Sequence, residues 1–408
     1  MAEKRKPEIR FRGFTDEWEQ RKVSDLAEKT HGGGTPATSN GTFWEGNIPW
    51  IQSSDIADGQ LFGIVPRKYI TEEGLNKSAA QLVPENSIAV IIRVGVGKLA
   101  FMPFSYATSQ DFLSLSKLTA EPQFTVYALY KKLKSELNAV QGTSIKGITK
   151  DELLVKEIMI PNFPEQKIIG SFFKHLDHLI TLHQRKYEKL QKVKKSMLEK
   201  MFPKNGSKVP EIRFRGFTDD WEQRKLGEMS SLITKGTTPL DKSNTGTVNF
   251  VKIESIDESS GEITITQKIS LDEHNGYLRR SQLKENDLLF SIAGTLGRVT
   301  SIKSSILPAN TNQALAIIRL KEGCLEYVKT YLKGKAVTDY IRKNPTIGAQ
   351  PNLSLEQVSN LKIAIPSEVE QEQLGNFFNH LDHLITLHQR KLEKLRNLKK
   401  ACLEKMFV

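Results

Sequence analysis

The chain has 408 residues but only two cysteines, Cys324 and Cys402, which is too few for a disulfide framework or a cysteine-rich metal site. We expect both to be reduced thiols. No apolar run reaches the roughly 18 residues that a membrane-spanning helix needs. The opening MAEKRKPEIR lacks the apolar core of a secretion signal. These absences predict a soluble, cytoplasmic protein without a membrane partner.

Motifs for nucleotide or nucleic-acid chemistry are missing as well. Residues 95–98 read GVGK, but Leu99 follows where a phosphate-binding loop needs Ser or Thr. Residues 161–164 read PNFP, which is not the NPPF or NPPY tetrad of an adenine methyltransferase. The sequence contains no DEAD-type helicase box and no convincing nuclease carboxylate cluster. We therefore expect no catalytic residue in this chain.

Two histidine pairs carry the spacing of metal ligands on a helix. His175 and His178 stand three residues apart, and His380 and His383 repeat them. No cysteine or carboxylate cluster completes such a site, and the intervening aspartate falls on another face. We expect no bound metal, and we interpret these residues as part of a helix surface that contacts a partner.

Positive charge is in excess. Lys and Arg number 59 against 47 Asp and Glu, so the formal net charge is +12 and the pI is near 9.4. This balance favours an acidic partner, and nucleic acid is the usual one. The length is sufficient for two domains of ordinary size.

Long stretches of the sequence occur twice. Residues 7–22 and 210–225 differ only at Glu17 and Asp220, and residues 175–186 and 380–391 are both HLDHLITLHQRK. Both halves close with LEKMF, whereas the regions at about 24–160 and 227–365 share only a thin pattern. Each half therefore pairs a variable domain with a constant segment. The predicted boundaries are 1–165 and 204–370 for the variable domains, and 166–203 and 371–408 for the constant segments.

The constant segments have the apolar period of long helices, with steps of four and three residues. Pro164 precedes the first helix and Pro203 ends it. The first seam is Ile169, Phe173, Leu176, Ile180, His183, Tyr187, Leu190, Lys194, Met197 and Met201. The second is Leu374, Phe378, Leu381, Ile385, His388, Leu392, Leu395, Lys399, Cys402 and Met406.

A single helix of this kind cannot bury its apolar stripe alone. The matched seams and their matched polar interruptions favour pairing of the two helices within one chain over two independent bundles. Antiparallel pairing would give a pseudo-twofold molecule, with the polar seam residues helping to set the register. The predicted fold is α+β: two mixed domains joined by two long helices that form an antiparallel coiled coil.

Each helix also carries a basic stretch. Residues 185–200 contain seven basic side chains against two acidic ones, and residues 390–405 contain the same numbers. Such stretches are either solvated faces or surfaces that lie near phosphates or an acidic partner subunit.

The variable domains mix strand and helix patterns. Residues 86–102 and 286–302 each predict a strand, a glycine turn and a second strand. Short helices are predicted near 126–137 and 325–342. Trp44 and Trp50 either line a groove or pack inside the domain, and packing is the favoured interpretation.

Polar loop residues of the variable domains are candidate DNA contacts. Arg and Lys can address guanine edges, Asn and Gln can address adenine, and Ser and Thr bind phosphates. Similar clusters also occur in ordinary turns. In the first domain the candidates are Thr35, Gln52, Ser53, Ser54, Arg93, Lys98, Ser109 and Gln110. In the second they are Thr238, Lys252, Arg298, Asn310, Asn312 and Gln313.

Two repeated motifs carry a family resemblance. A GxTP-like motif occupies residues 33–36 and 236–239. An Ile-Pro pair is followed by Glu-Gln and then Gly, at 160–170 and again at 365–375. With the doubled order of variable domain and constant helix, the chain resembles the specificity subunits of type I restriction–modification systems over nearly its whole length.

The resemblance implies a function. Each variable domain would be a target-recognition domain that reads one half of a bipartite, asymmetric site in double-stranded DNA, and the coiled coil would set the spacer. Two modification subunits would use S-adenosylmethionine to methylate adenine N6, and restriction (motor) subunits would use ATP and Mg²⁺. This chain would bind none of these cofactors and would not be an enzyme by itself. The alternatives are a coiled-coil adaptor with two RNA- or protein-binding modules, and an autonomous DNA enzyme.

Overall fold

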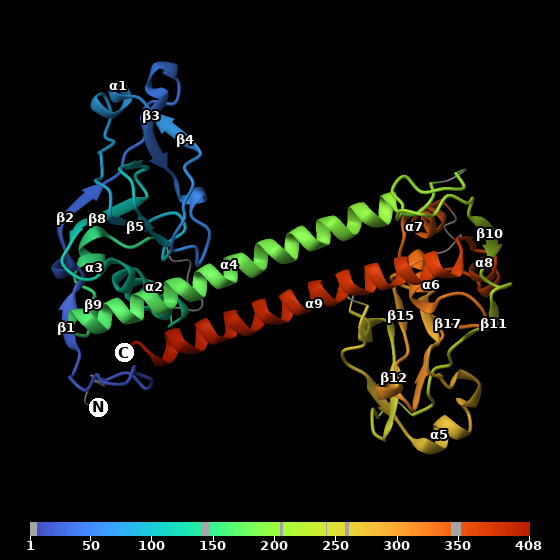
Figure 1. Ribbon diagram of the computed structural model, residues 1–408. Helices are drawn as coiled ribbons and strands as arrows, with labels where there is room; N and C mark the ends of the chain where they lie inside the picture. The colour runs from blue at the N-terminus through green and yellow to red at the C-terminus, as the bar shows by residue number, and fades with distance from the viewer. Residues whose placement is uncertain (1–5, 140–146, 205–206, 242, 258–260, 344–351) are drawn as a thin grey trace. The chain divides into compact units, whose positions relative to one another are not determined.

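The computed structural model describes residues 6–139, 147–204, 207–241, 243–257, 261–343 and 352–408 (Figure 1). The chain divides into two compact units. The first comprises residues 1–182 together with 392–408, and the second comprises residues 183–391. Each unit therefore combines one variable domain with parts of both long helices.

The first unit contains two principal sheets. An antiparallel four-stranded sheet has the order β2-β8-β5-β6, and a three-stranded sheet has the order β4-β3-β7 with β3 and β7 parallel. A short antiparallel pair joins β1 to β9. The strands are β1 (Glu19–Lys22), β2 (Ala27–Gly32), β3 (Trp44–Ile51), β4 (Lys68–Ile70), β5 (Ser87–Ile91), β6 (Leu99–Met102), β7 (Ala107–Thr108), β8 (Phe112–Leu118) and β9 (Glu157–Ile160). The shorter helices are α1 (Glu72–Asn76), α2 (Pro122–Ala139) and α3 (Lys150–Leu154).

The second unit repeats this plan. Its four-stranded sheet has the order β11-β17-β14-β15, its three-stranded sheet has the order β13-β12-β16, and β10 pairs with β18. The strands are β10 (Glu222–Lys225), β11 (Ser230–Lys235), β12 (Val248–Val251), β13 (Gln267–Ile269), β14 (Leu288–Ser291), β15 (Val299–Ser301), β16 (Ala309–Thr311), β17 (Leu315–Leu320) and β18 (Lys362–Ile365). The shorter helices are α5 (Leu271–Asn275), α6 (Leu325–Leu332), α7 (Lys335–Lys343) and α8 (Leu355–Ser359).

These elements confirm the mixed α/β prediction for each variable domain. The two predicted strand–turn–strand segments are β5–β6 and β14–β15, and glycines with positive φ lie in both turns. The predicted helix near 126–137 is α2. The one near 325–342 is two helices, α6 and α7, separated at Gly334.

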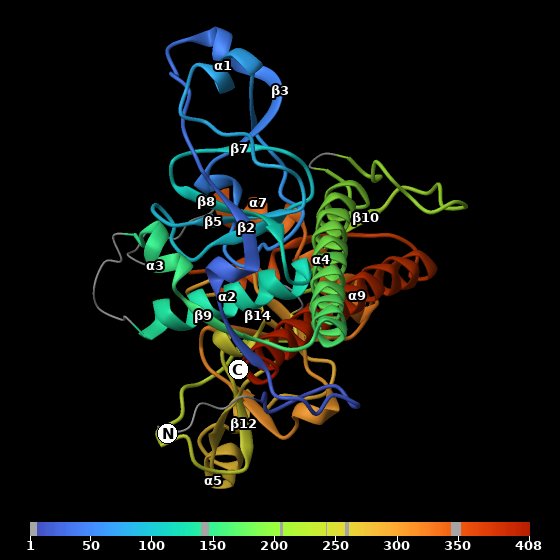
Figure 2. The same cartoon turned by 90° about the vertical axis from the view of Figure 1, so that its left-hand side faces the viewer.

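In the first unit, α2 lies between the four-stranded sheet and the start of α4, while α1 and β3 lie at the opposite end (Figures 1 and 2). Tyr127 of α2 packs its ring 5.1 Å from that of Phe173 on α4. The main core of the unit is thus built by one face of the sheet, α2 and the long helix. Residues 37–42, which precede β3, lie largely at the surface.

The long helices α4 (Phe163–Lys200) and α9 (Glu368–Lys405) have 38 residues each. All twenty predicted seam positions are buried or half-buried. In the second unit His183 meets His388 and Lys194 pairs with Asp382, so the numbering rises along α4 while it falls along α9. This confirms the antiparallel coiled coil. Pro164 lies in the first turn of α4 and not before it, where its missing N–H removes no helical hydrogen bond.

The LEKMF end of each helix belongs to the unit formed by the other half of the sequence. Phe202, which follows α4, contacts Trp221, Tyr327 and Phe378 in the second unit. Phe407, which follows α9, stacks on Phe124 at 5.4 Å and contacts Trp18 and Phe173 in the first unit. The two repeats thereby complete each other's cores.

The repeated opening segments fasten the start of each long helix. Nε and Nη2 of Arg10 donate to the two carboxylate oxygens of Glu165 at 2.7 Å each, and Arg213 binds Glu370 in the same way. Such bidentate pairing is strong when the carboxylate is buried and fully hydrogen-bonded. Ile9 N and Ile212 N donate to the carbonyls of Lys405 and Lys200, at 3.0 and 2.9 Å, at the ends of the helices.

Candidate nucleic-acid interface

Candidate residues from three separate loops of the first unit meet at one edge of the three-stranded sheet. Gln52 follows the end of β3, and Gln110 lies two residues beyond β7. Because β3 and β7 are parallel, their carboxyl ends lie at the same edge. The hydroxyl of Thr35, from the GxTP loop, donates to Oε1 of Gln110 at 2.7 Å.

The GxTP loop of the first unit is held tightly against β3 and β7. Gly34 N donates to Thr108 O at 2.8 Å, and the indole N–H of Trp50 donates to Gly34 O at 3.0 Å. A Cβ on Gly33 would lie 1.9 Å from the carbonyl oxygen of Ser109, so this close approach requires glycine. Thr35 is therefore presented by a rigid loop.

Trp44 and Trp50 pack against each other, as favoured from the sequence. Their rings stand edge to face with centroids 5.1 Å apart, and Trp50 is buried. Lys68 of β4 places its ammonium 5.6 and 5.7 Å from the two ring centroids. The tryptophans thus support the loop and hold a lysine beside it.

The second unit builds the same arrangement from a different sequence. Thr238 donates to Oε1 of Gln313, and Thr237 N donates to Thr311 O at 2.9 Å. Lys252 follows β12, and Asn312 follows β16. A hollow of about 210 Å³ adjoins them. It is lined by Thr238, Pro239, Asp241, Asn244, Phe250, Lys252, Gln267, Lys268, Ile269 and Asn312.

Several candidates hold loops in place. Ser109 is buried and donates to Asp111, and Ser53 and Ser54 form a short helical turn that Asp55 caps by accepting from Gln52 N. Arg298 donates to the carbonyls of Ile253 and Ile256 at 3.3 and 3.2 Å, which fixes the turn after Lys252.

Arg93 and Lys98 lie on the hairpin between β5 and β6. Arg93 is exposed and Lys98 is half-buried. Arg298 occupies the corresponding hairpin between β14 and β15. These residues remain candidate contacts on a loop separate from the Thr–Gln pairs.

Asn310 is placed differently from the sequence-based expectation. Its side chain is fully buried, and its amide oxygen lies 2.5 Å from Nδ1 of His274. Its amide nitrogen donates to the carbonyl of Leu278 and to the hydroxyl of Ser281. Asn310 therefore holds the segment after α5, and its amide is not presented to a ligand.

Sequence reasoning missed two kinds of basic residue near these loops. Lys68 and Lys268 are exposed on equivalent strands, β4 and β13. The two lysines are 200 residues apart, at corresponding positions of the two halves, and this correspondence could have identified them from the sequence. Arg280 places Nε 3.4 Å from the hydroxyl of Thr237. Both additions increase the positive charge around the GxTP loops.

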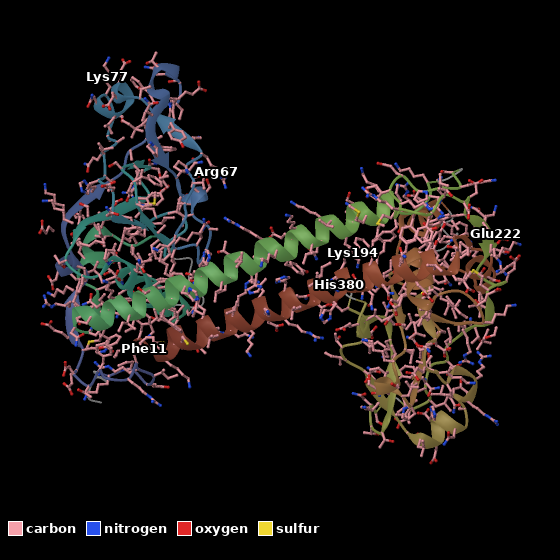
Figure 3. All side chains as sticks on the ribbon, in the orientation of Figure 1. Phe11, Arg67, Lys77, Lys194, Glu222 and His380 are labelled. Carbon is pink, nitrogen blue, oxygen red and sulfur yellow. The ribbon has the colours of Figure 1, made fainter. Side chains whose placement is uncertain are left out.

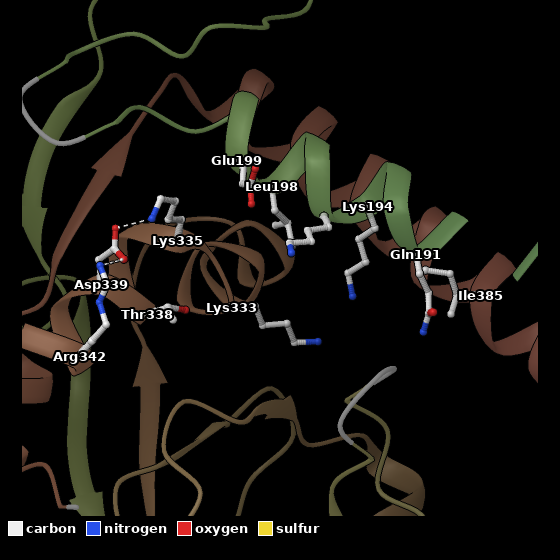
Figure 4. Close-up of a pocket in the computed structure, with 11 residues that line it drawn as sticks. Gln191, Lys194, Leu198, Glu199, Lys333, Lys335, Thr338, Asp339, Arg342 and Ile385 are labelled. Carbon is white, nitrogen blue, oxygen red and sulfur yellow. Dashed lines mark hydrogen bonds and ion pairs between the residues drawn. The ribbon is translucent and has the colours of Figure 1, made fainter. Parts of the chain in front are cut away.

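Another hollow, lined by several basic residues, lies in the second unit beside α4 and α7 (Figure 4). Its volume is about 510 Å³, and its lining includes Lys194, Lys333, Lys335 and Arg342 but none of the candidate DNA contacts. Lys335 and Arg342 both bind Asp339, at 2.8 and 3.1 Å. Burial lowers the pKa of Lys333 to about 8, against the opposing effect of Asp382.

The repeated histidines are exposed on the helices, as Figure 3 shows for His380 on α9. Across the described residues, no group of three or more His, Cys, Asp or Glu side chains is arranged to hold a metal ion. Cys324 and Cys402 are free. Among the helices of the described residues, none combines the length and the apolar character that crossing a membrane requires.

Relatives with known roles resemble both halves. The model of the type I restriction modification DNA specificity domain matches residues 15–192 and 218–397. The MjaIX specificity subunit of a type I restriction enzyme from Methanocaldococcus jannaschii is 23% identical over 415 residues, covering 96% of this chain and 92% of that protein. The EcoR124I/EcoR124II specificity subunit from Escherichia coli is 30% identical over 182 residues, covering 39% of this chain and 44% of that protein.

The fold is also that of a solved relative. The crystal structure of the type I restriction–modification S subunit from M. genitalium covers 99% of both chains, with a TM-score of 0.64 and 15% identity. The family match extends over both variable domains and most of both long helices. The chain therefore belongs to the specificity-subunit family of type I restriction–modification systems and carries one DNA specificity domain in each half.

Proposed function

We propose that each variable domain reads one half of a bipartite, asymmetric site in double-stranded DNA. The observation that carries this proposal is one polar loop edge built twice: the same Thr–Gln pair marks it in both domains, while the residues that follow its two parallel strands differ. Gln52 occupies the position that Lys252 has in the other domain, and Ser109 corresponds to Asn312. Because Gln and Lys suit different base edges, the two half-sites should differ.

The paired helices α4 and α9 act as the spacer between the half-sites in this proposal. Each helix is fastened by a bidentate Arg–Glu pair near its start and by a buried phenylalanine just beyond its end. In this proposal, fastening at both ends would keep the two helices from sliding along each other. It would therefore define one preferred separation, in the way that dimer geometry sets half-site spacing in other DNA-binding proteins.

The chain itself performs no chemistry in this proposal. Two modification subunits would bind it and use S-adenosylmethionine to methylate adenine, and restriction subunits would supply ATP- and Mg²⁺-dependent cleavage in the cytoplasm. The relatives named above are subunits of restriction enzymes, which supports such an assembly. The family match over both halves does not favour the alternative of an RNA- or protein-binding adaptor.

Methylation mapping tests the proposal. The chain is co-expressed with its modification subunit in a host without adenine methylation, and N6-methyladenine is located across the genome. The expected result is a single split motif, with two short and different specified parts around a fixed spacer. An assembled complex that methylates no motif would contradict the proposal, and a palindromic motif would contradict its claim of two different half-sites.

A further inference from the structure

The Thr–Gln pairs are the same in two domains that otherwise differ. Thr35 and Gln110 are 75 residues apart, as are Thr238 and Gln313, and in both pairs the threonine hydroxyl donates to Oε1 of the glutamine. All four side chains are exposed. Domains that read different bases cannot owe that difference to residues they share, so the pair should serve something common to both half-sites.

The hydrogen bond determines what each glutamine can offer. Since Oε1 accepts from the threonine, the amide is oriented with Nε2, a donor of two hydrogens, turned away from the threonine. Among the described residues the structure gives Nε2 of Gln110 and Gln313 no hydrogen-bond partner. A group presented in this way suits a ligand made of acceptors, which describes the phosphate oxygens of DNA better than the mixed donors and acceptors of base edges.

The surroundings of both pairs carry basic groups. Lys68 lies over Trp50, whose indole binds the loop that carries Thr35, and Lys268 lines the hollow beside Thr238. Arg280 approaches the hydroxyl of Thr237, next to Thr238. One carboxylate, Asp241, also lines that hollow. Cations beside an oriented amide donor favour an anionic ligand.

We infer that Thr35–Gln110 and Thr238–Gln313 form equivalent clamps on the DNA backbone, each donating from the glutamine amide to a phosphate oxygen. The clamps position the two domains on the duplex and contribute no sequence preference. This inference rests on the proposed DNA-reading function of the two domains.

Substitution of the glutamines tests the clamps in the full chain assembled with its modification subunit. Gln110→Ala and Gln313→Ala remove the donor. Each should weaken equilibrium binding by about fivefold. The loss of affinity should be the same for a duplex that contains the motif recognised by the complex and for one with a scrambled half-site, because phosphates are present in both. The methylated motif should stay unchanged.

Gln110→Glu and Gln313→Glu provide the matched variants. A glutamate has the same length and can still accept from the threonine hydroxyl, so the loop geometry is kept, but it offers no donor and adds a negative charge. We expect a loss larger than for alanine, roughly thirtyfold, on both duplexes. Thr35→Ser and Thr238→Ser keep the hydroxyl and should bind like the wild type.

The outcomes separate the inference from the proposed function. A wild-type complex that yields no split motif contradicts the function itself. If the wild type yields a motif but a glutamine variant changes the base required at one position, the glutamine reads a base and the clamp is wrong. A glutamate variant that gains a preference for cytosine would show this directly, because carboxylates accept from the cytosine amino group. Unchanged affinity for the scrambled duplex would also overturn the clamp.

Discussion

The Nδ1 atoms of His183 and His388 lie 2.8 Å apart where α4 meets α9 in the second unit. The two residues occupy equivalent positions of the repeated HLDHLITLHQRK segment, so the seam brings a histidine against its own counterpart. One ring must donate and the other accept, which is possible only while at least one ring is neutral. Burial lowers the pKa of His183, and nearby Lys391 and Lys186 lower it further. The pKa of His388 is lowered by burial, by His183 and by the same lysines.

The stability of this helix pair should therefore fall in acid. A histidine whose pKa is lowered in the folded state binds its proton more readily when unfolded. Stability is thus complete above the unfolded value of about 6.5 and is lost as the pH falls below it. Thermal unfolding at pH 7.5 and pH 5 measures the effect. A His183→Asn/His388→Asn protein should lose less stability between these two pH values than the wild type, and equal losses would contradict the assignment.

Truncation of the two repeated phenylalanines should act on opposite units. Phe407→Ala should destabilise the first unit and Phe202→Ala the second, each by about 3–5 kcal/mol, because each ring fills an aromatic core. Hydrogen exchange read separately on β5 and β14 reports the two cores. The variants serve as controls for each other, and an effect of Phe202→Ala confined to β5 would contradict the assignment of the helix ends.

Breaking the bidentate pair Arg213–Glu370 should be costly. Arg213→Met leaves a carboxylate that is 1% exposed without its cation, and we expect a loss of about 3–5 kcal/mol in unfolding free energy. Arg213→Met/Glu370→Leu removes both charges and should recover much of that loss. Denaturant unfolding measures the unfolding free energies of the single and double variants. Equal values for the two would contradict the prediction and indicate that the pair is only a surface contact.

The glycines after the two Glu-Gln motifs should differ in their tolerance of a side chain. A Cβ at Gly170 would lie 2.7 Å from Phe124 N and 2.9 Å from Gln123 Cβ, whereas at Gly375 the nearest atoms are 3.0 Å away. Gly170→Ala should therefore cost about 1–3 kcal/mol. Gly375→Ala should cost less, since the gain in helix propensity of about 1 kcal/mol offsets a smaller clash. Melting temperatures of the two proteins compare them, and a larger loss for Gly375→Ala would contradict the packing.

The position directly after the central parallel strand should influence the sequence that is read. Gln52→Lys should change the required base at one position of a single half-site, and Lys252→Gln should do so in the other, because lysine favours guanine acceptors and glutamine favours adenine. Methylation mapping of each variant gives the answer. If both variants methylate the same motif as the wild type, Gln52 and Lys252 do not determine which bases are recognised.

Much of the architecture could be predicted from the sequence because it is encoded by period and repetition. Steps of four and three residues identify α4 and α9, and Ile169 or Leu381 turned out to be buried where that period places them. The glycine turns between apolar strands were equally visible. The break between α6 and α7 at Gly334 was not, since one glycine does not by itself end a helix.

The site was only partly predictable. Thr35 and Gln110 were both candidates, but their hydrogen bond depends on the parallel pairing of β3 with β7, which no local pattern encodes. Asn310 looked like its polar neighbours Asn312 and Gln313, yet it points inward to His274. All three residues of β16 are buried, and Asn310 bonds to the segment after α5, whereas Gln313 lies beyond the strand and is exposed. Only the tertiary packing decides this.

The sequence by itself determined that this protein is doubled, that each half holds a variable domain and a long helix, and that the helices need an apolar partner. These properties follow from local periodicity and from near-identical segments. Only the tertiary structure decided that Phe202 completes the core of the second unit and Phe407 that of the first. The two LEKMF segments are identical, so their sequence cannot specify which unit's core each of them completes. The antiparallel pairing of the helices does so, because it brings the end of each helix beside the start of the other.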